Sequence, residues 1–333
     1  MATVLSRRCR VIVLGALLLI GACSSTNFVY NRLDFLVLWY IEDYVDLDQY
    51  QKQYTSDVLA SFLLWHRTHE LPDYLRILDQ IEDNLSQPQT PEMVASVFSE
   101  FEAAWLRLEK KGLGLLLDLG VQLSDEQIDG FMEKLWEQQV EFKDEYLERT
   151  DDEFHEDNYE ESVDSAREYL GPLSDKQLEL LRGFSRSLLR SDRVWLQERA
   201  EWLAELAVLL ERKPGWQERV REAVAARRNN PSAESRRVYD HNLQAIYAVI
   251  AQLLDGRSEQ QDAHLRDRLA SLREDLQVLI AEGAAPAGEP EPAGEPEPAS
   301  EPEPASEPEP ASEPDPAIEP DPASETPAVS PTG

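Results

Sequence analysis

Residues 90–108 read Thr-Pro-Glu-Met-Val-Ala-Ser-Val-Phe-Ser-Glu-Phe-Glu-Ala-Ala-Trp-Leu-Arg-Leu. Thr90 is a good N-cap residue, and Pro91 suits the first helical position because its missing N–H would have no partner there. The apolar residues that follow recur every three or four positions and therefore share one helical face. They are Val94, Val97, Phe98, Phe101, Trp105 and Leu108. This stretch predicts an amphipathic helix packed against a core.

The same spacing of apolar residues continues along the chain. One stripe comprises Ile128, Phe131, Leu135, Phe142 and Tyr146, and another comprises Leu178, Leu181, Leu188, Trp195, Trp202, Leu206 and Leu209. No stretch alternates apolar and polar residues as a half-buried strand does. The sequence therefore predicts an all-α fold, a multi-helix bundle of long antiparallel helices. The expected helices cover residues 29–44, 48–86 (bent at Pro72), 91–119, 124–149, 153–169, 174–212, 216–228, 232–254 and 258–281.

Two of these helices open on nearly the same five residues. Residues 123–127 read Leu-Ser-Asp-Glu-Gln, and residues 173–177 read Leu-Ser-Asp-Lys-Gln. Each is a capping box, in which Ser and Gln bond the backbone N–H groups at the helix start. The two boxes lie 50 residues apart, which fits either a duplicated helical hairpin or a chance repeat of a common cap. The box also resembles the Leu-Thr-x-x-Gln motif of small periplasmic helical chaperones.

The N-terminus has the pattern of an export signal. Arg7, Arg8 and Arg10 precede an apolar run from Val11 to Ile20, which is too short to span a bilayer as a mature helix. Residues 20–23, Ile-Gly-Ala-Cys, resemble a lipobox. That resemblance implies cleavage before Cys23, acylation of Cys23 and a stable anchor of two or three acyl chains. The alternatives are an uncleaved anchor and a plain secretory signal.

Charge and cysteine usage exclude several classes of protein. The formal net charge is -33, and the two cysteines are Cys9, inside the signal, and Cys23. No pair of free thiols remains for a disulfide or a cysteine-based zinc site. So acidic a chain is unsuited to nucleic acid and to anionic lipid, both of which need clustered Lys and Arg.

The C-terminus is a low-complexity segment that repeats Glu-Pro-Glu-Pro-Ala from about residue 289. Proline at alternate positions forbids a helix, and the like charges repel one another. We expect a disordered, extended tail that acts as a spacer or bait, or that has no partner. The predicted organisation is a signal peptide at 1–22, a helical lipoprotein domain at 23–282 and a tail at 283–333.

The first part of the predicted domain resembles a known family. Residues 28–34 read Phe-Val-Tyr-Asn-Arg-Leu-Asp, residues 39–47 read Trp-Tyr-Ile-Glu-Asp-Tyr-Val-Asp-Leu, and Trp65-His66-Arg67 and Glu70-Leu71-Pro72-Asp73-Tyr74 follow. With the lipobox, these sequence motifs resemble the domain-of-unknown-function 6279 family of proteobacterial lipoproteins over about residues 23–282. The resemblance implies an all-helical lipoprotein and assigns no activity.

Three groups of residues are candidate sites. The aromatic segment from Tyr30 to Tyr54 forms an interfacial helix, or Phe28 to Tyr44 packs into the bundle as core, and the acidic charges of the segment favour core. His66, His69 and Glu70 share a helical face that could bind a divalent metal, although a simple polar cluster is the alternative. The acidic residues between Asp144 and Glu161 predict a solvated face rather than a cation site or a surface for a basic partner. These residues are Asp144, Glu145, Glu148, Asp151, Asp152, Glu153, Glu156, Asp157, Glu160 and Glu161.

No catalytic motif is present in the sequence: it has no Gly-x-Ser-x-Gly elbow, no free cysteine nucleophile and no glycine-rich phosphate loop. We therefore expect no enzyme and no cofactor. Ser24 stands where an aspartate would retain a lipoprotein in the inner membrane. The sequence thus predicts an outer-membrane lipoprotein that faces the periplasm and binds an envelope protein or cell-wall component. The alternative is a carboxylate-based hydrolase or cell-wall-modifying enzyme.

Overall fold

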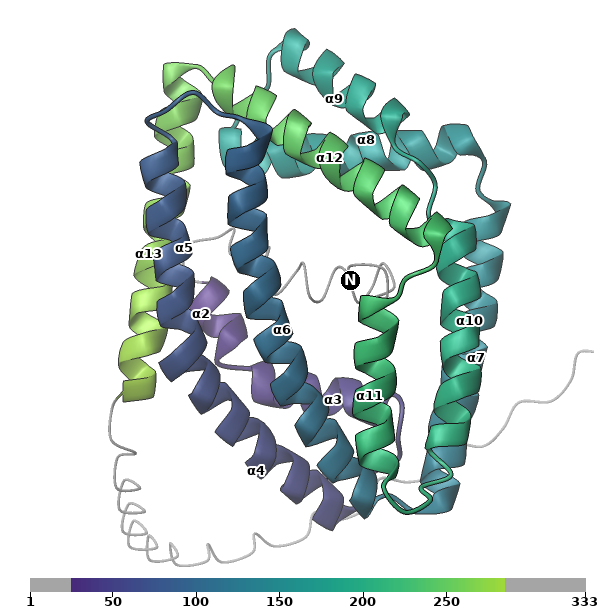
Figure 1. Cartoon of the computed structure of the whole chain (residues 1–333). Coiled ribbons are helices and arrows are strands. Elements are labelled where there is room, and N and C mark those ends of the chain that lie inside the picture. The colour runs from purple at the N-terminus through teal and green to yellow at the C-terminus, as the bar shows by residue number, and fades with distance from the viewer. Residues whose placement is uncertain (1–24, 285–333) are drawn as a thin grey trace, which may run out of the picture. The chain divides into compact units, whose positions relative to one another are not determined.

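The computed structural model describes residues 25–284, and every regular element among them is a helix (Figure 1). In chain order these elements are α2 (Ser25–Tyr30), α3 (Leu33–Glu42), α4 (Gln49–Trp65), the π-helical turn η1 (His66–Glu70), α5 (Leu71–Asn84), α6 (Pro91–Gln122), α7 (Asp125–Glu148), α8 (Asp151–Leu170), α9 (Asp175–Ser187), α10 (Asp192–Leu209), α11 (Trp216–Asn229), α12 (Ala233–Asp255) and α13 (Glu259–Ala284). The predicted all-α class is confirmed for this part of the chain. The signal peptide, Cys23 and the tail from residue 285 lie outside the described residues.

Most helices begin where the sequence places a cap. The Thr90 hydroxyl accepts a hydrogen bond from the Met93 amide at 3.3 Å and starts α6. Ser124 and Ser174 start α7 and α9 in the same way, and both predicted capping boxes are complete. Because these caps satisfy backbone donors that have no partner within the helix, they fix where each helix starts.

The predicted single helix over residues 174–212 is wrong, because the chain breaks between Ser187 and Asp192. The break is stabilised by residues of α12 that lie more than fifty positions further along the sequence. The Asn242 side chain accepts from the Leu189 amide at 2.8 Å and donates to the Leu189 carbonyl at 2.9 Å. The Ser187 carbonyl bonds His241 Nε2 at 2.8 Å. No glycine or proline marks the break, so local sequence could not reveal it.

Two further predicted helices are interrupted. The helix expected at 29–44 is divided into α2 and α3 at Asn31 and Arg32. The helix expected at 48–86 contains the π-turn η1 directly before α5, close to the bend predicted at Pro72. Proline cannot donate to the carbonyl four residues earlier and its ring clashes there, so a wider turn accommodates it.

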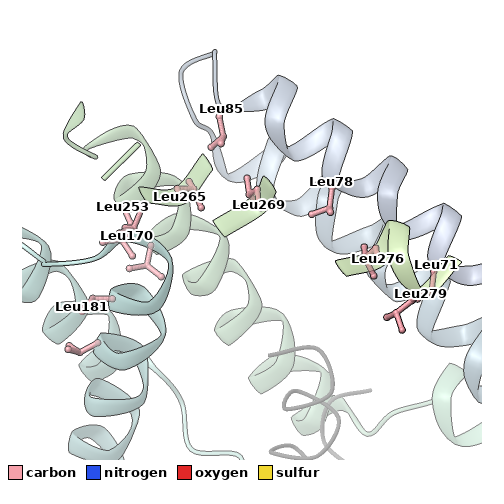
Figure 2. Packing of buried hydrophobic residues seen from close by; sticks show 12 residues of the cluster. Leu71, Leu78, Leu85, Leu170, Leu181, Leu253, Leu265, Leu269, Leu276 and Leu279 are labelled. Atoms are coloured by element: carbon pink, nitrogen blue, oxygen red, sulfur yellow. The ribbon is translucent and has the colours of Figure 1, made fainter. Parts of the chain in front are cut away.

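The largest buried cluster lies where α5, α8, α9, α12 and α13 meet. Figure 2 shows Leu71 and Leu78 of α5, and Leu85 directly after it, beside a leucine row of α13. That row is Leu265, Leu269, Leu276 and Leu279. Leu71 and Leu279 are among the most completely buried side chains. The seven-residue spacing of the α5 leucines places them on one stripe, as in helices that pack lengthwise.

Helix starts are also joined in pairs. Besides the predicted boxes at Ser124 and Ser174, Asp48 caps α4 with Gln51, and Ser258 exchanges the same bonds with Gln261 at the start of α13. The Ser124 box pairs with the Asp48 box, and the Ser174 box pairs with the Ser258 box, through their glutamine amides. The two predicted boxes therefore each pair with a box that sequence analysis missed.

Candidate functional site

A groove lies between α6, α10, α11 and the start of α12, with a cavity volume of about 680 Å³. Its lining combines aromatic and charged side chains from all four helices and the 229–231 connection. The residues used below are Glu102, Trp105, Glu109, Glu198, Trp202, Arg227, Arg228, Arg236 and Tyr239. A hollow of this volume lies within the range, roughly 300–1,000 Å³, that ligand sites occupy.

The aromatic side chains of the groove are Trp105, Trp202 and Tyr239. All three are half-buried, so each presents part of a ring to the hollow. The Arg227 guanidinium lies 5.6 Å from the Trp202 ring centre, a cation–π distance. Burial raises the pKa of Tyr239, helped by nearby Glu102. Flat, half-buried rings of this kind dominate protein-binding surfaces.

Two arginines of α11 are fixed in the wall of the groove. Arg228 Nη1 donates to Glu109 Oε1 at 2.5 Å, and Arg227 Nη1 donates to the Glu198 carbonyl at 2.7 Å. Burial lowers the pKa of Arg227 despite three nearby glutamates. Burial also raises the pKa of Glu109, outweighing the attraction of Arg228. The groove therefore holds charged groups that have lost much of their water.

Further positive charge lies at the mouth of the groove. Arg236 and Arg237 are exposed and line an adjoining hollow of about 380 Å³ with Pro231, Ala233 and Asp240. Within residues 212–237 the chain has eight Arg and Lys against three Glu, a net charge of +5. This is a basic segment in a chain whose overall charge is -33.

Sequence analysis missed this groove. Trp105 and Trp202 have the spacing of buried helical stripes, and the net charge of the whole chain hides the local excess of arginine. The signal that could have found the site is the local excess of arginine between residues 212 and 237. The two tryptophans come from α6 and α10, about a hundred residues apart, and Tyr239 comes from α12. No local pattern could bring these residues together.

The predicted cluster of His66, His69 and Glu70 lies at the π-turn, but the three side chains do not converge. His66 is half-buried between two tyrosines, with Nδ1 bonded to the Tyr30 hydroxyl at 2.7 Å and Nε2 to the Tyr74 hydroxyl at 3.3 Å. His69 is exposed and stacks on Trp65 instead. Burial lowers the pKa of His66 to about 4, so its ring is neutral at pH 7.

Glu70 is 2% exposed and is held by Arg107 of α6. Arg107 Nε donates to both carboxylate oxygens at 2.9 and 3.0 Å, and Nη2 donates to Oε2 at 2.7 Å. Arg107 also bonds Asp73 at 2.9 Å. Within residues 25–284 no group of three His, Cys, Asp or Glu side chains is arranged to hold a metal ion. The ion pair between Arg107 and Glu70 therefore connects α6 to the π-turn.

The chain matches a family of unknown function, DUF6279, over residues 43–236. The chain belongs to this family. The match includes Trp65-His66-Arg67 and Glu70–Tyr74, whereas Phe28–Asp34 precedes it, so it is shorter than the expected 23–282. No curated protein and no solved structure matches the chain.

In this DUF6279 chain the aromatic segment near the N-terminus is divided between core and surface. Tyr44 and Tyr54 pack on Val45, Leu47 and Leu119, as predicted for core. Other members are exposed, against the prediction that Phe28 to Tyr44 packs as core. Phe28 is 62% exposed, Phe35 64% and Trp39 62%. None of the helices between residues 25 and 284 has the length and apolar character to span a bilayer.

The acidic residues of the DUF6279 chain between Asp144 and Glu161 lie mainly on the surface, as predicted. Several bond arginines: Asp157 pairs with Arg149 at 2.8 Å, and Asp151 pairs with Arg190 at 2.7 Å. Glu153 caps α8 as part of the Thr150 box. Asp157 and Asp151 are therefore used in ion pairs, and Glu153 is used in capping.

Proposed function

We propose that the chain is a non-enzymatic lipoprotein, anchored in the outer membrane through Cys23 and facing the periplasm, that binds extended acidic segments of partner proteins. The binding site is the groove between α6, α10, α11 and α12. The anchor is supported by the basic, apolar and lipobox sequences at residues 7–23. The binding role is supported by the groove itself, with its half-buried tryptophans and its arginines.

The groove lining holds three arginines against four carboxylates, which are Glu102, Glu109, Glu198 and Asp240. We therefore infer an acidic partner from the arginines that have no carboxylate partner. Arg228 is already paired with Glu109, but Arg236 and Arg237 have no carboxylate partner among the ion pairs of the described residues. Arg227 bonds a backbone carbonyl rather than a carboxylate. A carboxylate that pairs with these guanidinium groups in a partly water-excluded groove makes a charge-assisted hydrogen bond, which is stronger than a neutral one.

The aromatic walls select an extended peptide. Trp and Tyr rings form the grooves in which proline-rich segments dock, because a polyproline II chain is already ordered and presents flat ring faces. Proline alternating with glutamate therefore suits both the rings and the arginines of this groove. The C-terminal repeat of the chain has this chemistry, which makes it a suitable probe.

Binding of a labelled peptide with the sequence of residues 295–310 tests the proposal. Fluorescence anisotropy would be measured on a chain that ends at Ala284, because residues 25–284 contain every packing contact described above. We expect saturable binding that weakens with salt. The double variant Arg236→Ala/Arg237→Ala should bind roughly tenfold more weakly, the loss of two ion pairs of up to about 1 kcal/mol each.

A matched control distinguishes an effect of the groove arginines on binding from an effect of the net charge. Arg186 and Arg193 are also exposed but lie outside the groove. The double variant Arg186→Ala/Arg193→Ala changes the net charge equally and should bind like the parent. Equal weakening in both double variants would show only a non-specific charge effect, and no binding by the parent would refute the proposal.

The anchor has its own test. Cys23→Ala should remove acylation, so that the chain leaves the membrane fraction or remains an uncleaved precursor. Unchanged lipid labelling of that variant would contradict the anchor and leave the groove untouched.

One observation favours the second candidate, a carboxylate-based hydrolase. Burial raises the pKa of Glu109, which lines the groove with Glu102 and Glu198, and that chemistry requires one carboxyl group of raised pKa close to a second carboxylate. Glu109 is nevertheless bonded to Arg228, which suits a structural carboxylate better. Turnover of cell-wall material that is lost in Glu109→Gln would establish the enzyme in place of the binding protein.

A further inference from the structure

Helix α3 is apolar all round, yet none of its residues is buried. Residues 33–42 read Leu-Asp-Phe-Leu-Val-Leu-Trp-Tyr-Ile-Glu, and no side chain of the helix falls in the buried class. A helix with apolar residues on every side is ordinarily enclosed by protein or by lipid. In the described part of the chain, protein covers only one side of α3.

That covered side packs against the connection before α4 and the end of α6. Leu38 and Ile41 contact the cluster of Val45, Leu47 and Leu119. The uncovered side presents Phe35, 64% exposed, Trp39, 62% exposed, and Leu36, 40% exposed. Phe28 of α2 adds a further ring that is 62% exposed. We call these four residues the aromatic patch.

The position of the aromatic patch in the chain identifies what covers it. Helix α2 begins at Ser25, two residues after Cys23. Since an extended chain spans at most about 3.6 Å per residue, the Cys23 sulfur lies within roughly 10 Å of the start of α2. Acyl chains on Cys23 would therefore enter the bilayer close to the start of α2, the helix that carries Phe28. Exposed apolar patches of this kind mark membrane surfaces.

We propose that the aromatic patch lies in the bilayer interface and holds the lipid-anchored domain against the membrane surface. This inference rests on the acylation of Cys23 in the proposed function. Trp and Phe rings suit this depth.

The charges around the patch specify the lipid. Arg32 lies over the Phe28 ring at 5.2 Å, and Asp34 and Asp43 are exposed on either side of Phe35 and Trp39. An anionic surface would repel these carboxylates, whereas a zwitterionic surface would not. The patch is therefore built for zwitterionic phospholipid.

Depth-dependent fluorescence quenching tests this surface. The acylated full chain is reconstituted in phosphatidylcholine vesicles with and without brominated acyl chains, which quench only tryptophans in contact with them. We expect the native chain to lose a fraction of its fluorescence that Trp39→Tyr does not lose. Trp136 of α7 is 38% exposed, and Trp136→Tyr, the matched control, should be quenched like the native chain.

Each other outcome has a definite meaning. Acylation of Cys23 measured by mass spectrometry, with equal quenching of the native chain and Trp39→Tyr, would overturn the patch and leave the anchor standing. Absence of acylation would overturn both. A dimer of the Cys23→Ser chain in solution that Phe35→Ser/Trp39→Ser dissociates would show that a second copy covers the patch instead of lipid, and would also overturn the inference.

Discussion

The side-chain amides of Gln177 and Gln261 donate to each other's carbonyl oxygens, each at 3.0 Å, in the buried contact between the starts of α9 and α13. Each carbonyl oxygen also accepts the N–H of its own N-cap residue, Ser174 at 3.0 Å and Ser258 at 3.1 Å. Gln51 and Gln127 repeat this exchange at the starts of α4 and α7. One residue type thus caps its own helix and joins it to another.

The paired glutamines also bond the backbone that precedes a partner's cap. Gln261 Nε2 donates to the Pro172 carbonyl, two residues before the Ser174 cap. Gln127 and Gln51 donate to the Asp46 and Gln122 carbonyls, each two residues before the partner's cap. The capping glutamines therefore have structural partners for their amide groups, which accounts for the Leu-Ser-x-x-Gln pattern without a binding role.

Gln177→Ala should destabilise the domain by about 2–4 kcal/mol. It removes one member of the capping box and both buried hydrogen bonds between the two glutamine amides, so that Gln261 keeps only its bonds to Pro172 and Ser258. Gln197→Ala is the control, because Gln197 makes only an exposed bond to Glu201 and its loss should cost under about 0.5 kcal/mol. Urea unfolding measures both. Equal costs would contradict the role given to the paired glutamines.

Arg107→Ala should cost about 3 kcal/mol, because it leaves the buried Glu70 carboxylate without its counterion. We take the lower end of the range for such losses since the Arg107 side chain is 42% exposed. Arg76 pairs with Asp73 at the surface, and Arg76→Ala should cost under about 1 kcal/mol. Thermal unfolding of the two variants measures both losses of stability. An Arg107→Ala chain as stable as the Arg76→Ala chain would refute the role given to Arg107 as the counterion of Glu70.

His66 should make the domain less stable as the pH falls. Burial holds its folded pKa at about 4, below its value of about 6.5 in the unfolded chain. Between these values the unfolded state binds more protons, so stability is present above pH 6.5 and is lost as the pH falls toward 4. The loss attributable to His66 between pH 7 and pH 5 is about 2 kcal/mol.

Replacing the ring isolates this contribution. His66→Phe should flatten the pH dependence of the free energy of unfolding over that interval, whereas His69→Phe, at the exposed histidine, should leave it unchanged. Identical slopes for the parent and His66→Phe would show that His66 is not buried in its neutral form.

The C-terminal repeat should compete for the groove. Tethering gives residues 289–325 an effective concentration of order millimolar beside any site they can reach, so the full chain should bind the acidic probe peptide more weakly than the chain ending at Ala284. A full chain whose tail is replaced by a Gly-Ser segment of equal length is the control and should bind like the truncated chain. Equal affinities of the full chain, the truncated chain and the Gly-Ser chain for the probe peptide would show that the tail does not compete for the groove.

The helical class and most helix starts could be predicted from sequence, because caps such as Thr90 and Ser124 and the apolar spacing that follows them are local. The break after Ser187 could not, since Asn242 stabilises it from another helix. The prediction that the aromatic segment packs as core was wrong for its exposed half, for a related reason. Spacing shows that α3 is apolar, but only the fold shows how much of it other helices cover.

The groove was beyond sequence analysis because its parts become a site only when folded. Trp105 and Trp202 have the spacing of core residues, and their exposure depends on how far α11 and the start of α12 close over α6 and α10. Arginines 227, 228, 236 and 237 were visible as a local charge excess, yet their significance depends on the rings beside them.

Photo-crosslinking of the acidic peptide to the chain tests the central claim most directly. A peptide with the sequence of residues 295–310, carrying a benzophenone at one end, is irradiated with the chain that ends at Ala284, and the crosslinked positions are identified by mass spectrometry. The account predicts adducts on the groove lining, at Trp105 to Glu109, at Trp202 and within residues 227–240. Adducts spread over other helices, with none on these residues, would contradict it.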